Sequence, residues 1–240
     1  TDELDAPPTL YMKFRSDALG QATLRGFFGL LYSQSKRHLI WRLTGYYKAK
    51  EYYYSSEIRH IYHVWRDLNR LYKWNLATVE DLKGKDFVFY PLHIEPERTL
   101  QGASPEYFYQ HTSIISIARD LPAGVMLAVK EHIPAAGRRP SNFYDQIRDL
   151  KNVILVDPRE HGLEIVRHAL ATITIAGSAG LEAAIFGKPV ITFGRHTLYN
   201  FLPHVLNAHS EESIRGHLSD AIYGKIDLEK AKRDGARFFQ

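Results

Sequence analysis

The stretch ATITIAGSAGLEAAIFGKPVITF, residues 171–193, holds a complete strand–helix–strand pattern. The β-branched run at 172–176 predicts a strand, and residues 179–186 have the composition of a short helix. A Gly-Lys-Pro break then precedes a second β-rich run at 190–193. Two strands joined by a helix in this way are typical of a parallel sheet.

The same alternation extends over the chain from residue 86 onward. Short β-rich runs are separated by segments of helical length. Right-handed crossovers between such strands predict an α/β fold with one doubly wound parallel sheet. The expected strands are residues 87–92, 125–131, 153–156, 172–176 and 190–193, and the expected helices are 105–120, 143–150, 162–171, 179–186 and 210–223.

The front of the chain has a different composition. Residues 11–78 contain 12 Lys or Arg and only 4 Asp or Glu, and 15 of the 30 aromatic residues lie before residue 79. Apolar residues recur there at helical spacing, which predicts two or three helices. A short helix or loop should follow at 78–85, with Gly84 as the break. We therefore expect a helical linker or insertion at 1–85 and a sheet domain at 86–240.

Three uses of this basic, aromatic front segment remain open. Its aromatic residues could be buried against a neighbouring domain, which is their commonest fate. The mixture of Lys and Arg with Trp and Tyr also suits anionic lipid headgroups. Nucleic-acid binding is the least favoured of the three, and we expect no nucleic-acid partner.

Several classes of protein are excluded by what the sequence lacks. The chain has no Cys, so it has no disulfide or thiolate metal site, and a reducing cytoplasm is the expected location. Its apolar runs are far shorter than the roughly 20 residues of a membrane-spanning helix. Dinucleotide-binding, P-loop, serine-hydrolase, zincin and EF-hand motifs are missing. His60 and His63 have no third ligand at matching spacing, so no metal site is predicted.

The small residues between strand and helix point to an anion site. Backbone N–H groups and the positive end of a helix dipole would converge at Gly177, Ser178, Ala179 and Gly180. Glu182, one turn later, could accept hydrogen bonds from the vicinal hydroxyls of a ribose. Alternatively, the glycines only allow tight packing and Ser178 only caps the helix.

Two further groups of polar residues follow other predicted strands, where ligands bind in open α/β sheets. Lys130 and His132 alternate along a strand, so both could meet a diphosphate or a sugar carboxylate near Ser178. His93 and Glu95 could serve as general bases or orient a substrate. The alternative for each group is an ordinary polar strand end.

A third strand end, at residues 194–196, offers another cation. Gly194, Arg195 and His196 follow the last predicted strand, and Tyr199 and Asn200 could reach a bound base or sugar. We rank this group below the others.

Four segments of the sheet region are informative in combination and in this order. They are YPLHIEPE (90–97), VKEHIP (129–134), YDQIRDL with NVILVDP (144–150 and 152–158), and TIAGSAGLE with GKPV (174–182 and 187–190). Together they resemble the capsule polysaccharide biosynthesis family, which includes capsular β-Kdo glycosyltransferases with the two-Rossmann GT-B architecture. The resemblance covers about residues 86–205.

This resemblance implies transfer of a sugar from a nucleotide-sugar donor, CMP-linked Kdo in the best-known members, to a growing glycan or glycolipid. The reaction would take place at the inner face of the cytoplasmic membrane without a metal or another cofactor. Residues 86–240 would be the Rossmann-like, nucleotide-sugar-binding C-terminal half of a GT-B enzyme. The implied catalytic residues are His93, Glu95 and His132, and the implied donor-binding residues are Lys130, Gly177, Ser178, Ala179, Gly180 and Glu182.

Two departures from the family pattern affect these expectations. Ile133 separates His132 from Pro134, where the family usually has His followed directly by Pro. Two Rossmann halves also need more than 240 residues, at roughly 100 to 200 residues per domain. Because the chain also begins at Thr1, we expect a fragment or trimmed chain that lacks the N-terminal, acceptor-binding half.

Two other functions remain open. An epimerase of the UDP-N-acetylglucosamine 2-epimerase type has a similar glycine-rich turn, Glu and Gly-Lys-Pro-Val strand. It needs carboxylates for proton transfer, and these are scarce beyond Glu95, Glu97 and Glu131. A non-catalytic domain that binds a partner or lipid through residues 11–78 is the other alternative.

Overall fold

The computed structural model describes residues 23–45, 51–95, 109–135, 138–208, 211–224 and 226–238. Glu97 and the expected start of a helix at 105 lie outside these residues. The chain forms two compact units, which we call the helical unit (residues 1–75 and 133–139) and the sheet unit (residues 76–132 and 140–240). The predicted domain boundary after residue 85 stays a prediction.

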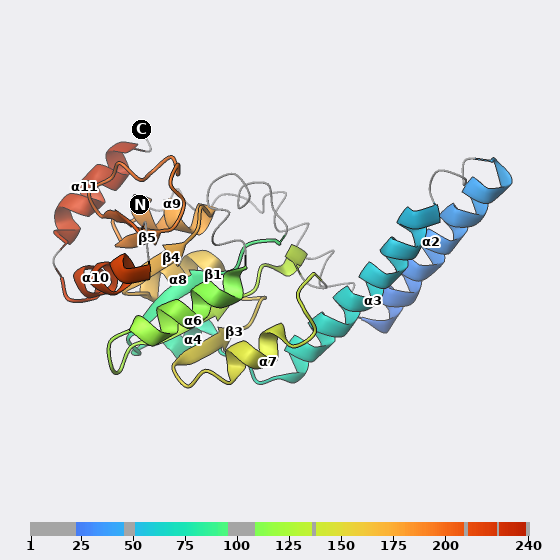
Figure 1. Ribbon diagram of the computed structural model, residues 1–240, viewed down its shortest axis with the longest axis horizontal. Coiled ribbons are helices and arrows are strands. Elements are labelled where there is room, and N and C mark those ends of the chain that lie inside the picture. Colours follow the sequence, from blue (N-terminus) through green and yellow to red (C-terminus); the bar gives the residue numbers. More distant parts are fainter. Residues whose placement is uncertain are drawn as a thin grey trace. The chain divides into compact units, whose positions relative to one another are not determined.

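The helical unit contains two long helices, α2 (Leu24–Leu43) and α3 (Glu51–Lys73), as the apolar spacing predicted (Figure 1). The hydroxyl of Thr23 accepts a hydrogen bond from the Gly26 N–H at 3.0 Å and so caps α2. The ring of Phe27 packs on that of Trp65 at 5.3 Å, and Arg37 pairs with Glu57. The short 3₁₀ helix η3 (Ile133–Ala135) belongs to the same unit.

The sheet unit is built on six parallel strands in the order β3-β2-β1-β4-β5-β6. All five predicted strands are present, and the sixth, β6, was not predicted. The chain passes from β1 to β2 and then to β3 in one direction across the sheet. It then returns, so that β4 lies on the other side of β1. The strands are β1 (Phe87–Pro91), β2 (Met126–Lys130), β3 (Val153–Val156), β4 (Ala171–Thr174), β5 (Val190–Thr192) and β6 (Val205–Asn207).

Helices cover the sheet in two groups, which confirms the doubly wound α/β fold. The first group joins α6 (Gln110–Asp120) to α7 (Phe143–Arg148) and α10 (Glu211–Ile222). The second joins α9 (Ser178–Ile185) to α8 (Gly162–His168) and α11 (Leu228–Phe238), with the short α4 (Val79–Leu82) against α8. Among the described helices, none is both long and apolar enough to cross a bilayer.

The core sits on β1, where Phe87 to Tyr90 are all buried because helices cover both faces of the sheet. This burial explains why the strand is a continuous apolar run instead of an alternating one.

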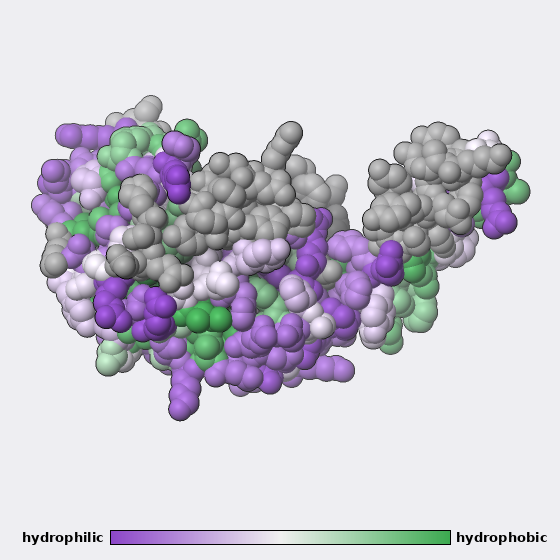
Figure 2. Space-filling view, viewed as in Figure 1, coloured by the Kyte–Doolittle hydropathy of each residue, from purple (hydrophilic) through white to green (hydrophobic). Residues whose placement is uncertain are grey.

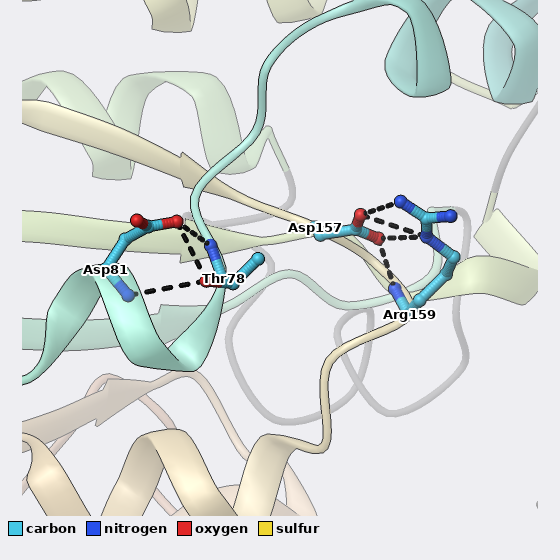
Figure 3. A network of polar contacts seen from close by, with 4 residues as sticks. All are labelled: Thr78, Asp81, Asp157 and Arg159. Atoms are coloured by element: carbon cyan, nitrogen blue, oxygen red, sulfur yellow. Dashed lines mark hydrogen bonds and ion pairs between the residues drawn. The ribbon is translucent and has the colours of Figure 1, made fainter.

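The segment before β1 is held by a capping box. The Thr78 hydroxyl accepts from the Asp81 N–H at 3.3 Å, and the Asp81 carboxylate accepts from the Thr78 N–H at 2.8 Å (Figure 3). Gly84 then ends the helix with a φ of 76°, as its predicted role as a break requires. Nearby, the carboxylate of Asp157, directly after β3, is bonded by the Arg159 side chain and backbone N–H (Figure 3).

Candidate functional site

The candidate site lies where β1 and β4 run side by side. The chain winds away from this pair in opposite directions, so their carboxyl ends form the topological switch point of the sheet. Ligands of open α/β sheets bind at such points, because the loops there part to opposite faces. The residues after β1 include His93 and Glu95, and β4 leads into the glycine corner, which we define as residues 177–180.

His93 joins the two strand ends. Its Nε2 lies 3.1 Å from the Thr174 hydroxyl oxygen, which in turn accepts the Gly177 N–H at 3.0 Å. Its Nδ1 lies 3.3 Å from Oε1 of Gln110. Since an amide oxygen only accepts, Nδ1 carries the proton, and Nε2 accepts from the Thr174 hydroxyl. Both ring nitrogens of this buried histidine therefore face partners inside the fold.

Gln110, the first residue of α6, fixes both candidate bases after β1. Its Oε1 accepts the His93 backbone N–H at 2.7 Å, and its Nε2 donates to the His93 carbonyl at 3.0 Å. The same Nε2 donates to Oε1 of Glu95 at 2.6 Å, and the backbone N–H of Gln110 reaches that oxygen at 3.1 Å. Glu95 thus caps the N-terminus of α6, where a negative charge is favourable.

The two glycines of the glycine corner, Gly177 and Gly180, are packed too tightly for a side chain in their place. A Cβ on Gly177 would lie 2.8 Å from Nε2 of His93, and one on Gly180 would lie 2.4 Å from the Tyr199 hydroxyl. That hydroxyl donates to the Gly177 carbonyl at 2.8 Å, and burial raises the pKa of Tyr199. The alternative in which the glycines serve packing is therefore supported, and Tyr199 is part of that packing.

The first turn of α9 presents a second kind of surface. Gly177 is the N-cap, Ser178 is exposed, and the first N–H groups of the helix have no intrahelical partner. Glu182, one turn along on the same face, is partly buried, and burial raises the pKa of its carboxyl. Among the described residues, neither the Ser178 hydroxyl nor the Glu182 carboxylate makes a hydrogen bond or ion pair.

The Lys130 and His132 pair is arranged differently from the expectation. Strand β2 ends at Lys130, which is buried beside Pro91, so strand alternation does not extend to His132. Between them, Glu131 is buried, and its oxygens accept from the His132 N–H at 2.6 Å and the Tyr144 hydroxyl at 2.7 Å. The predicted meeting of Lys130 and His132 at Ser178 stays a prediction.

Two asparagines that follow β5 form hydrogen bonds around the end of that strand. Asn200 accepts from the Thr192 hydroxyl at 2.8 Å and donates to the Gly194 carbonyl at 2.8 Å. Asn207 donates to the Thr192 hydroxyl and to the same carbonyl, both at 2.8 Å. Asn200 is therefore engaged inside the protein, while Arg195 is exposed. In the described part of the chain, no group of three or more His, Asp or Glu is placed to hold a metal ion.

The structure thus brings His93, Glu95 and Gly177 into one network. The sequence interpretation missed its two central members, Gln110 and Thr174, because an amide and a hydroxyl match no catalytic motif. The predicted strand at 172–176 put Thr174 in its middle, and only the structure shows that β4 ends at this residue.

The solved structures that this chain matches include a 2-epimerase and two β-Kdo transferases. The UDP-GlcNAc 2-epimerase of Methanocaldococcus jannaschii, in complex with UDP-GlcNAc and UDP, is 15% identical with a TM-score of 0.49, covering 72% of this chain and 50% of that one. The β-Kdo 2,7 transferase KpsC of Thermosulfurimonas dismutans is 18% identical with a TM-score of 0.42, covering 73% and 62%. The β-Kdo 2,4 transferase of that KpsC is 14% identical with a TM-score of 0.42, covering 58% and 44%.

This chain therefore spans between 44% and 62% of the length of these three proteins. No curated protein matches the sequence.

A family model gives the firmer assignment. The model described as capsule polysaccharide biosynthesis protein matches residues 15–202, which is well over half of the 240 residues. The match takes in α2 and α3 as well as the first five strands of the sheet. The chain belongs to the capsule polysaccharide biosynthesis family.

Proposed function

We propose that this chain is the nucleotide-sugar-binding part of a glycosyltransferase that assembles a capsular or surface polysaccharide. The observation that carries the proposal is that exposed Ser178 and Glu182, whose carboxylate has no partner in the described part of the chain, lie on one face of α9. Burial penalises this carboxylate, so keeping it charged costs free energy that a ligand with hydrogen-bond donors would offset.

A nucleotide sugar has the matching chemistry. Its phosphate would accept from the N–H groups of Ser178 and Ala179 and from the Ser178 hydroxyl. Its ribose hydroxyls would donate to Glu182. The donor would then lie along the glycine corner, with its sugar directed towards the end of β1.

In the proposed reaction, the bond between the anomeric carbon and the donor phosphate breaks, and an acceptor hydroxyl oxygen forms the new bond to that carbon. The nucleotide leaves with the electron pair, and Lys130 and His132 would stabilise its charge without a metal. The proton of the acceptor must pass to a base, for which we propose Glu95, because His132 has to be protonated to stabilise the leaving nucleotide. His93 would instead position the corner, because its ring nitrogens are engaged by Gln110 and Thr174.

The donor and the acceptor are parts of the same proposal. CMP-linked Kdo is the donor we test first, and the acceptor is a glycan or glycolipid at the inner face of the cytoplasmic membrane. We propose that residues 86–240 are the donor-binding domain and that the acceptor is bound by a further Rossmann-like half.

A thermal-shift titration with CMP, UDP, GDP and CMP-Kdo tests the donor site. A ligand at 100 times its Kd stabilises the folded chain by about 2.7 kcal/mol, or roughly 5 to 10 °C at this size. Ser178→Ala and Glu182→Ala should reduce the shift, whereas Glu229→Ala, on the exposed first turn of α11, should retain it.

Each outcome of the titration has a defined meaning. A shift with CMP that both substitutions reduce supports the transferase. A preference for UDP, with turnover of UDP-GlcNAc in the absence of an acceptor, would favour the epimerase. If no nucleotide shifts a folded chain, the donor-site proposal is wrong and the corner serves packing alone.

A further inference from the structure

Helix α2 has apolar side chains on two opposite sides. One side faces α3, where Phe27 meets Trp65. The other side is exposed, and none of the 20 residues of α2 is buried. We call its five large apolar residues the outer stripe: Leu24, Phe28, Tyr32, Leu39 and Leu43, which are between 55% and 78% exposed.

The outer stripe runs along the helix and is interrupted at exposed Ser35, between Tyr32 and Leu39. At 100° per residue, its five members fall within an arc of about 100° that does not include Phe27, and they extend for about 28 Å. Apolar side chains are visible along α2 in Figure 2, next to hydrophilic ones. Large apolar side chains grouped on one side of a helix indicate an interaction site, unlike single exposed apolar residues.

The charges beside the stripe are all positive. Helix α2 contains Arg25, Lys36, Arg37 and Arg42 and no Asp or Glu. Arg37 is paired with Glu57, but Arg25 and Lys36 form no ion pair among the described residues. Helical geometry places Arg25, Lys36 and Arg42 at the edges of the stripe. The surface is therefore apolar along its middle and cationic along its sides.

We infer that the outer stripe docks on a membrane surface that contains anionic phospholipid. Phe and Leu side chains would enter the acyl boundary, Tyr32 would sit at the headgroup level, and the cations would meet lipid phosphates. A second copy of the chain fits less well, since a two-fold interface would bring this set of cations against the same set on the other copy, with no acidic residue of α2 to pair with them. The inference adds a membrane-binding surface to the proposed transferase. Only the biological purpose of membrane binding rests on the proposed function, since the binding itself is argued from α2.

Co-sedimentation of the full chain with vesicles tests the inference. The chain should pellet with phosphatidylglycerol–phosphatidylcholine vesicles, less so in high salt, and least with phosphatidylcholine alone. Phe28→Ser with Leu39→Ser should weaken binding by about tenfold or more, since two large apolar contacts are lost. Arg25→Ser with Lys36→Ser should remove much of the preference for the anionic lipid. Leu198→Ser, at an 82% exposed position in the sheet unit, should bind like the wild type.

Other results would overturn the inference. One is a folded chain that stays in solution with anionic vesicles, and another is full binding by the Phe28→Ser, Leu39→Ser variant. If the wild type is a dimer that the same variant makes monomeric, and neither pellets, the stripe covers a second copy. Vesicle binding is measured without nucleotide, so a failure to bind vesicles would not change the result of the donor-site titration.

Discussion

The two sides of the glycine corner differ in how completely their polar groups are paired. On the β1 side, His93, Gln110 and Thr174 are buried, and every one of them is hydrogen-bonded. On the α9 side, Ser178 is exposed and the Glu182 carboxylate has no partner among the described residues.

This difference separates what holds the corner from what could bind a ligand. A buried, satisfied network stabilises one geometry, and removing a member leaves other buried groups unpaired. A partly buried, unpaired carboxylate does the reverse, because it reduces stability until something binds it. Substitutions on the two sides should therefore have opposite effects on stability.

The largest effect is expected on the paired side. Gln110→Leu keeps the size of the side chain but removes the hydrogen bonds that this side chain makes with the His93 N–H and the His93 carbonyl. It also removes one of the two hydrogen bonds from Gln110 to Oε1 of Glu95, the one donated by the side chain. We expect a loss of about 3 kcal/mol, or roughly 6 to 12 °C in melting temperature by circular dichroism. Gln146→Leu, at an exposed position in α7, is the matched control and should change little. Equal melting temperatures for the two variants would mean that the network is not a stabilising unit.

On the unpaired side, a substitution should stabilise the protein and weaken binding. Glu182→Gln removes a charge that burial disfavours, so we expect a melting temperature roughly 2 °C higher at pH 7. It also removes the charged acceptor for ribose, so nucleotide affinity should fall by about tenfold or more.

The raised pKa of Glu182 also predicts how the difference in stability between the wild type and Glu182→Gln changes with pH. Because the folded-state pKa of Glu182 is raised, the unfolded chain ionises first as the pH rises above the ordinary value of 4.5. The wild type therefore loses stability relative to the variant above that pH, until the folded carboxyl ionises as well. Glu229→Gln, on exposed α11, should show neither effect, and a destabilised Glu182→Gln variant would contradict the assignment.

The extent of burial explains which parts of the fold could be predicted from the sequence. Apolar runs such as residues 87–90 are long enough to indicate buried strands, and their order gave the sheet. Strand β6 buries only Val205, whereas the equally short β5, which was predicted, is buried at all three positions. Helix α11 buries only Ala231 and Gly235. Local patterns report burial, and these two elements bury little.

The site was predictable only where a residue type suggested its chemistry. His93, Glu95 and Glu182 stand out as acids or bases, and the structure brings the first two together. Gln110 lies 17 residues from His93, so its role depends on how α6 is placed against β1. Nothing in the chain near Gln110 encodes that placement. The alternation of side chains along a strand also did not predict that β2 ends at Lys130.

The smallest predicted effect concerns a second unpaired group, one that no ligand could reach. His204 is fully buried, and its Nε2 donates to the Ala184 carbonyl at 2.8 Å. Its Nδ1 has no hydrogen-bond partner among the residues that the structure describes. Burial lowers the pKa of His204, although the bond to Ala184 and the charge of Asp234 partly oppose this. Unlike Glu182, this unpaired atom should affect only stability.

Because the unfolded chain takes up a proton at about pH 6.5 and the folded chain does so only at lower pH, stability should fall as the pH drops below 6.5. The contribution of His204 is at most about 1.4 kcal/mol per pH unit. His204→Gln retains a donor for Ala184 without titrating, so its melting temperature should fall less than that of the wild type between pH 7.5 and 5.5. His168→Gln, at an exposed position in α8, should follow the wild type. Parallel curves for the wild type and His204→Gln would show that the buried ring does not set the acid sensitivity.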